Sequence, residues 1–243
     1  MSSSFDQQGF DIRCEWGESG IRELAPASDV VIVVDTLSFT TCVEIAVFRG
    51  ATIIPFRSRG EGAQAYAAAH GAALAGKRGE GLSLSPESML GVAAGARIVL
   101  PSPNGATITL AVDHPDILAG CLRNATAVAR AAAGIGNRIA VIPAGERWPD
   151  RSLRPSLEDW VAAGAIISAL SGKLSAESTA ALAAFDSAGD LEALLSSCGS
   201  GRELIERGYE EDVRLAAMYD VSTTVPRLID GAYAAFRRSS STS

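Results

Sequence analysis

The chain has 243 residues, and its 21 Lys and Arg against 28 Asp and Glu give a formal net charge of −7. Apolar residues make up 47% and charged residues 20%, which excludes a disordered, collagen-like or coiled-coil chain and indicates a globular protein. The two Lys and 19 Arg are dispersed along the chain, which excludes a nucleic-acid binder because such proteins neutralise phosphates with dense basic clusters.

Short apolar runs alternate along the chain with polar turns and Ala-rich helical stretches. The clearest unit begins with the β-branched run at 29–35, which predicts a strand covered on both faces. It continues into a helix expected over 42–49 that ends before Gly50. Further strands are expected at 52–56, 96–101, 116–120 and 138–144, with helices at 61–74, 106–112, 125–133 and 156–170. This alternation predicts a three-layer α/β/α sandwich around a mainly parallel or mixed sheet.

From about Ser175 the pattern becomes almost entirely helical, and no strand set is expected there. The expected helices are 176–186, 191–196, 200–207 and 209–219. Ser200 and Glu203 have capping-box spacing, so Glu203 is assigned to helix stability. We interpret the whole chain, 1–243, as a single domain. It divides into an N-terminal segment (1–28), a strand and helix core (29–174), a helical C-terminal third (175–236) and a frayed tail (237–243).

The four Cys residues form no CxxC pair and have no nearby His. This spacing excludes the common zinc motifs and indicates reduced, structural thiols. The N-terminus lacks a basic segment followed by an apolar one, and no apolar run approaches the roughly 20 residues of a membrane span. We therefore expect a cytoplasmic protein that does not bind membranes.

Three polar loops follow predicted strands, and ligands of open parallel sheets bind where such loops meet. In the first loop Asp35 directly follows the apolar run, so its carboxylate stands at the strand tip, where it can bind a metal or attack phosphorus. Ser38, Thr40 and Thr41 begin the next helix and can hold an anion with hydroxyl and N–H groups. The structural alternative is that Asp35 closes the turn and a Ser or Thr caps the helix.

The second loop contains Ser102, Asn104 and Gly105. Asn-Gly favours left-handed turn geometry, and prolines on both sides of Ser102 stiffen the approach. Ser102 and Asn104 can therefore be preset hydrogen-bond donors to an oxyanion. An ordinary turn is the alternative, and convergence with Asp35 in space distinguishes the two.

The third loop, residues 143–159, holds three Arg and four acids between a strand and a helix. Glu158 and Asp159 can supply hard oxygen ligands to Mg²⁺, which takes few carboxylates and keeps water and phosphate oxygens. The alternative is dipole compensation and capping that involves Ser156 and Asp159. The arginines, at 147, 151 and 154, can clamp an anionic substrate or be solvated on the surface.

These three loops, in this order, resemble the 2-phosphosulfolactate phosphatase (ComB) family, over residues 29 to about 228. The resemblance is carried by 29–41, 84–87, 103–105, 124–125, 144–145, 156–159, 163–164, 200–208, 211–212, 220–221 and 225–226. It implies an α/β fold and Mg²⁺-dependent hydrolysis of a small anionic phosphate monoester, 2-phosphosulfolactate or a related phospho-hydroxy acid. A non-catalytic small-anion binding protein and a different metal-dependent hydrolase remain the alternatives.

Carried over by position, the resemblance makes Asp35 the catalytic group, as nucleophile or metal ligand. The residues expected around the substrate are Ser38, Thr40, Thr41, Ser85, Ser102, Asn104, Gly105, Gly145, Glu146 and Arg147. The expected Mg²⁺ ligands are Asp35, Glu158, Asp159 and Asp212. The family commonly carries Arg where this chain has Ser38, so the fold and metal chemistry transfer better than the substrate. A homodimer is also expected.

Overall fold

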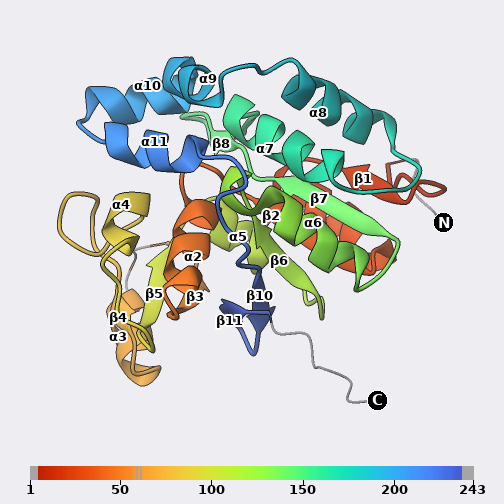
Figure 1. Cartoon of the computed structure of the whole chain (residues 1–243). Helices are drawn as coiled ribbons and strands as arrows, with labels where there is room; N and C mark the ends of the chain where they lie inside the picture. The colour runs from red at the N-terminus through yellow and green to blue at the C-terminus, as the bar shows by residue number, and fades with distance from the viewer. Residues whose placement is uncertain (1–4, 59, 61, 237–243) are drawn as a thin grey trace.

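The computed structural model describes residues 5–58, 60 and 62–236, and its centre is a nine-stranded sheet with helices against both faces (Figure 1). The strands of that sheet are β1 (Ile12–Cys14), β2 (Val30–Val34), β3 (Thr52–Phe56), β4 (Ala73–Leu74), β5 (Arg97–Pro101), β6 (Ile117–Gly120), β7 (Ile139–Pro143), β10 (Pro226–Ile229) and β11 (Ala232–Ala235). A separate antiparallel pair consists of β8 (Glu146–Arg147) and β9 (Leu153–Arg154).

The helices cover the sheet and form most of the C-terminal part. They are α1 (Gly17–Leu24), α2 (Phe39–Phe48), α3 (Ala63–Ala69), α4 (Pro86–Met89), α5 (Gly105–Thr109), α6 (Ala125–Ala133), α7 (Leu157–Ser168), α8 (Ala176–Asp186), α9 (Leu191–Ser197), α10 (Gly199–Glu206) and α11 (Glu210–Ala217), with 3₁₀ turns η1 (Ala25–Ala27) and η2 (Leu122–Asn124). None of the helices in the described ranges is long and apolar enough to cross a bilayer.

The strand order is β1-β7-β2-β6-β10-β11-β3-β5-β4. Two parallel groups, β1-β7-β2-β6 and β3-β5-β4, are joined by the antiparallel hairpin β10–β11. The hairpin makes one residue pair with each group, Arg227 with Leu118 and Tyr233 with Ile53. The predicted α/β fold with a mainly parallel, mixed sheet is confirmed.

Side chains of β2 alternate between two cores, as expected for a strand covered on both faces. Val31 and Val33 pack with residues of α1, α2 and α5 on one face. Val30, Ile32 and Val34 pack with residues of α6, α7 and α8 on the other. All five side chains are fully buried, so the sheet is the middle of three layers and β2 holds a central position in it.

The expectation that the C-terminal third contains no strands is wrong, because β10 and β11 lie inside the sheet. A turn at Asp230 and Gly231 joins them, with φ of 49° and 77°. An Asp-Gly pair readily adopts two left-handed residues in succession, which is what a tight hairpin turn requires. This dipeptide was the local signal for the hairpin.

Other expected boundaries also need correction. The helix expected over 61–74 ends at Ala69, and Ala73–Leu74 form β4 after Gly71, whose φ is +58°. The segment 1–28, for which no element was expected, contains β1 and α1. The expected tail, 237–243, lies outside the described residues.

The capping box expected at Ser200 and Glu203 is also wrong. Cys198 caps α10, because its sulfur accepts a hydrogen bond from the Gly201 N–H at 3.4 Å. Ser200 therefore lies inside the first turn, and Glu203 forms an exposed ion pair with Arg207. The four Cys residues are buried and form no disulfide, as expected for structural thiols.

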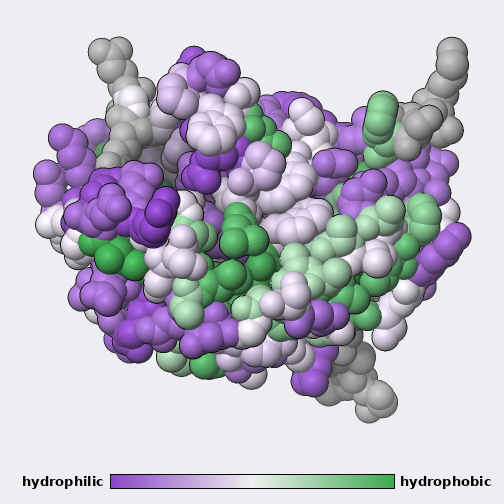
Figure 2. Space-filling model, turned by 90° about the horizontal axis from the view of Figure 1, so that it is seen from above, coloured by the Kyte–Doolittle hydropathy of each residue, from purple (hydrophilic) through white to green (hydrophobic). Residues whose placement is uncertain are grey.

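Figure 2 looks down on the side where α8, α9 and α10 lie in Figure 1 and shows an apolar band flanked by hydrophilic residues. Exposed apolar surface of this kind occurs on many monomers as well as at interfaces. The homodimer therefore stays a prediction.

Candidate active site

Asp35 lies at the carboxyl end of β2 and is 5% exposed. Its Oδ1 accepts a hydrogen bond from the Phe39 N–H at 3.1 Å, and its Oδ2 accepts one from the Gly105 N–H at 2.7 Å. A Cβ at position 105 would lie 2.4 Å from the Phe39 ring and 2.7 Å from Asp35 Oδ2, so this approach requires glycine. The first two predicted loops therefore converge on the Asp35 carboxylate.

The third loop reaches the first through Asp159. Its Oδ1 accepts from the Thr36 N–H at 2.7 Å and its Oδ2 accepts from the Gly145 N–H at 2.9 Å. Capping by Ser156 is wrong, since that side chain makes no capping bond and its buried hydroxyl oxygen has no partner in the described part of the chain. Asp159 thus joins two loops of the site instead of capping its helix.

The hydroxyls of Thr40 and Thr41 are occupied by backbone groups. Thr40 Oγ1 accepts from the Asp35 N–H at 2.9 Å and lies 2.8 Å from the Asp35 carbonyl oxygen, to which it donates. Thr41 Oγ1 donates to the Thr36 carbonyl at 2.8 Å. Both side chains are fully buried. These contacts favour the structural role for the two threonines, which hold the loop that presents Asp35.

Four acidic side chains gather where the loops meet. Burial, with a smaller contribution from the charge of Glu158, raises the pKa of Asp35 to about 6, against the backbone hydrogen bonds from Phe39 and Gly105, which lower it. Burial also raises the pKa of Glu146 to about 7, with contributions from the charges of Asp35 and Glu158 and opposition from the Asn104 hydrogen bond and the Arg154 charge. Burial, followed by the Asp35 and Glu158 charges, raises the pKa of Asp159. The site therefore concentrates negative charge that protons or a cation must balance.

The donor chemistry of this acidic group fits Mg²⁺. No group of three or more His, Cys, Asp or Glu side chains in the described residues is placed to hold a metal ion, but Mg²⁺ keeps waters and needs only one or two carboxylates together with phosphate oxygens. Asp35, Glu158 and Asp159 are all buried, and among the described residues the Glu158 carboxylate accepts one weak hydrogen bond, from Cys198 Sγ at 3.4 Å. Both oxygens of Asp159 accept from backbone N–H groups, as both oxygens of Asp35 do. These bonds orient the loops, and the role of Asp159 as a Mg²⁺ ligand stays a prediction.

Asp212 lies in a different group from the other predicted ligands. It forms a buried ion pair with Arg78 and accepts hydrogen bonds from Ser85 Oγ at 2.6 Å and the Glu87 N–H at 2.9 Å. Its carboxylate is therefore already neutralised and held. Ser85 was expected to bind the substrate, but its hydroxyl donates to this Asp212 carboxylate.

A cleft of about 520 Å³ opens beside Asp35. Of the predicted residues, Ser38, Ser102, Asn104 and Glu146 line it together with Asp35. Its other lining residues are Leu37, Lys77, Arg78, Leu84, Pro103, Ser200, Glu203, Leu204 and Arg207. The predicted catalytic group and four predicted substrate-binding residues therefore share one cavity.

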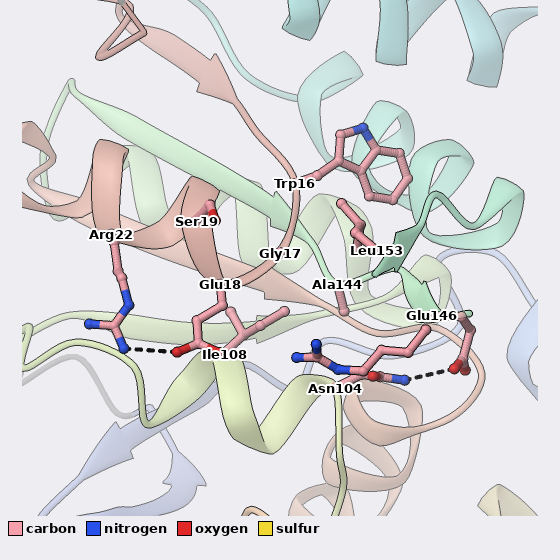
Figure 3. Close-up of a pocket in the computed structure, with 11 residues that line it drawn as sticks. Trp16, Gly17, Glu18, Ser19, Arg22, Asn104, Ile108, Ala144, Glu146 and Leu153 are labelled. Carbon is pink, nitrogen blue, oxygen red and sulfur yellow. Dashed lines mark hydrogen bonds and ion pairs between the residues drawn. The ribbon is translucent and has the colours of Figure 1, made fainter. Parts of the chain in front are cut away.

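A second cavity, of about 340 Å³, adjoins this cleft (Figure 3). Asn104 and Glu146 line both cavities, and Asn104 Nδ2 donates to Glu146 Oε2 at 2.9 Å. Arg147 lines the second cavity and not the cleft, and its guanidinium donates to the Arg151 carbonyl at 3.2 Å. Of the three arginines in the third loop, Arg154 is the one that lowers the pKa of Glu146. It also donates to Ser200 Oγ at 3.0 Å.

The basic side chains of the cleft, Lys77, Arg78 and Arg207, were not predicted from the sequence. A local signal existed at the first two, since one of the chain's two lysines stands beside an arginine between Gly76 and Gly79. Arg207 had no comparable signal, because only packing of the C-terminal helices brings it to the strand ends.

Replacing Glu146 by Gln is expected to make the free energy of unfolding depend less on pH. The measurement is made with a chelator present, so that no metal binds to the acidic side chains. Because the folded pKa of about 7 exceeds the reference value of 4.5, the folded state keeps this proton while the unfolded state loses it. The wild-type free energy of unfolding should therefore fall as pH rises from 4.5 to 7, on the order of 2 kcal/mol from this group.

Urea unfolding at pH 5 and 7.5 measures this difference. The exposed Glu206 provides the matched control, and Glu206→Gln should retain the wild-type slope of stability against pH. An unchanged slope in Glu146→Gln would contradict the assignment of this proton to Glu146.

Comparison with known proteins agrees with the resemblance given above. The sequence profile of the family described as 2-phosphosulpholactate phosphatase matches residues 20–231. The chain is 30% identical over 219 residues to a "Probable 2-phosphosulfolactate phosphatase" of Gloeobacter violaceus, covering 84% of this chain and 91% of that one. It is 33% identical to the protein of the same name from Carboxydothermus hydrogenoformans, with 84% and 89% covered.

A "2-phosphosulfolactate phosphatase" of Methanothermobacter thermautotrophicus is 28% identical over 213 residues, with 86% and 91% of the two chains covered. The profile match spans well over half of this chain, and the similar proteins align over most of their own lengths. The chain belongs to the 2-phosphosulfolactate phosphatase family.

Proposed function

We propose that this protein is a Mg²⁺-dependent phosphatase that hydrolyses 2-phosphosulfolactate or a closely related phospho-hydroxy acid. The observation that carries the proposal is the buried Asp35 carboxylate, held by two backbone N–H groups from different loops at the edge of a 520 Å³ cleft. The names of the similar proteins supply the substrate.

The chain's own residues account for binding and orientation. The Asp35 carboxylate is fixed in position. Direct attack on phosphorus and orientation of the attacking water both require this. Asn104 holds Glu146 in the same cavity, which makes Glu146 the acid available to protonate the leaving oxygen. Asp35 and Glu158 would hold Mg²⁺, which when bound neutralises phosphate oxygens.

Phosphate release from 2-phosphosulfolactate tests the proposal. We expect turnover by the purified chain with Mg²⁺, loss of turnover with excess EDTA, and recovery when Mg²⁺ is restored. A panel of phosphate monoesters run in parallel ranks the substrate preference. Calorimetry that shows 2-phosphosulfolactate binding without any phosphate release would instead support a non-catalytic anion-binding protein.

A further inference from the structure

The cleft is lined by both acidic and basic side chains. We call Asp35 and Glu146 the acidic side and Lys77, Arg78 and Arg207 the basic side, and Glu203 also lines the cleft as the ion-pair partner of Arg207. The basic residues come from the loop between β4 and α4 and from the end of α10, and not from the loops that hold the acids. In Figure 1 the β4–α4 loop lies beside α4 and below α10 and α11.

Arg78 is held firmly in this position. Its side chain is 12% exposed, it forms the ion pair with Asp212, and its Nη2 donates to Ser38 Oγ at 3.0 Å. The guanidinium lies 5.3 Å from the centre of the Tyr209 ring, and the Tyr209 hydroxyl donates to the Arg78 carbonyl at 3.1 Å. A cation with this many fixed partners is preorganised to bind an anion without further ordering of its side chain.

Lys77 supplies the positive charge that is not already balanced. Arg78 is paired with Asp212 and Arg207 with Glu203, whereas Lys77 forms no ion pair within residues 5–58, 60 and 62–236. It is exposed and lines the cleft next to the fixed arginine. The basic side therefore carries one free cation beside a guanidinium with N–H groups to spare.

The loop that carries Lys77 is positioned by close packing. Gly79 has φ of +90°, and a Cβ there would lie 3.0 Å from the Tyr209 hydroxyl oxygen. Tyr209 also lies 5.7 Å from the Arg207 guanidinium. One aromatic ring thus contacts both arginines of the basic side and the turn that follows Lys77.

We propose that Lys77, with Arg78 and Arg207, forms a subsite for a second anionic group of the substrate, separate from the phosphate that reacts at Asp35. The proposal rests on the proposed function, whose substrate carries a sulfonate and a carboxylate besides the phosphate, and it assigns recognition of one of these groups to the three basic side chains. The cleft is larger than a phosphate alone requires, and the acidic side repels an unneutralised anion. The basic side therefore decides which end of the substrate faces Asp35.

Lys77→Met tests the subsite, with Lys173→Met as the matched control because Lys173 is the other lysine and contacts Phe10 outside the cleft. The substrates are 2-phosphosulfolactate and phenyl phosphate, which has no second anion. For Lys77→Met we expect KM for 2-phosphosulfolactate to rise about tenfold with kcat unchanged, and kcat/KM for phenyl phosphate to stay at the wild-type value. Lys173→Met should match the wild type on both substrates.

An unchanged KM for 2-phosphosulfolactate in Lys77→Met, or an equal loss on both substrates, would overturn the subsite. If the wild type hydrolyses only 2-phosphosulfolactate, the test is the KM of Lys77→Met for that substrate compared with the KM of Lys173→Met. Equal values would overturn the subsite. If the wild type releases no phosphate from either, the proposed function fails, and calorimetry with 2-phosphosulfolactate still tests the subsite. The expected result is then about tenfold weaker binding to Lys77→Met than to Lys173→Met, and equal affinities or no binding at all would overturn it.

Discussion

Asp35→Asn is expected to lower kcat for phosphate release from 2-phosphosulfolactate by about 10³-fold or more, the scale seen when a group that acts on the transition state is removed. Asn preserves the size of the side chain but cannot attack phosphorus and binds Mg²⁺ more weakly than a carboxylate. Both possible roles of Asp35, nucleophile and metal ligand, therefore predict the same loss.

The fold should survive this substitution. The amide NH₂ would face one of the two N–H donors, Phe39 or Gly105, and lose that hydrogen bond, which costs about 1–3 kcal/mol. Loss of a buried negative charge beside Glu158 offsets part of this cost. Circular dichroism and thermal unfolding check the fold, and Asp186→Asn, at an exposed position of α8, is the control that should keep the wild-type rate. Wild-type turnover by Asp35→Asn would show that the reaction does not depend on this carboxylate.

Arg123→Met is expected to lower the free energy of unfolding by about 3–5 kcal/mol, the cost of removing one partner of a buried ion pair. Arg123 Nε lies 2.6 Å from Glu44 Oε2, and the two side chains are 12% and 0% exposed. Arg123 Nη1 also donates to the Leu215 carbonyl at 3.2 Å. The substitution would leave Glu44 charged inside the protein without a cation and would remove a link between α2 and α11.

The double variant Glu44→Leu/Arg123→Met should recover most of this loss, because an apolar pair of similar volume removes the stranded charge. Arg214→Met is the matched control. Its partner is Glu211, the two side chains are 48% and 35% exposed, and an exposed pair contributes about 0–1 kcal/mol. Urea unfolding measures all three variants. A cost below about 1 kcal/mol for Arg123→Met would show that this ion pair does not stabilise the fold.

The sequence predicted an element correctly where its local residue pattern matched the packing that the tertiary structure provides. The run at 29–35 predicted the central strand because five β-branched residues in succession need cover on both faces, and the structure provides two cores. The position of Asp35 directly after that run placed its carboxylate at the strand tip. The left-handed turn predicted for the Asn-Gly pair at 104–105 is wrong, because Asn104 has a φ of −105° and Gly105 begins α5. Glycine is required at 105 for a different reason, since its N–H approaches Asp35 Oδ2 to 2.7 Å.

The order of the strands was beyond what these signals contain. Nothing local to Pro226–Ile229 and Ala232–Ala235 shows that this hairpin enters the sheet between β6 and β3, more than 100 residues earlier in the chain. Thr40 and Thr41 were likewise ambiguous, because a hydroxyl at a helix start can serve an anion or the backbone, and only the observed partners decide.

The sequence by itself determined the α/β class, the reduced cysteines, the family and the position of Asp35 at a strand tip, because each rests on a pattern contained in one short segment or in an ordered set of segments. The tertiary structure decided which acids meet. It brought Glu146, Glu158 and Asp159 to Asp35, and it placed Asp212 with Arg78 instead. It also brought Lys77 and Arg207 to one cleft. The physical reason is that the burial and charge balance of each side chain depend on which segments pack against it. In this site those segments are more than 100 residues apart in the sequence.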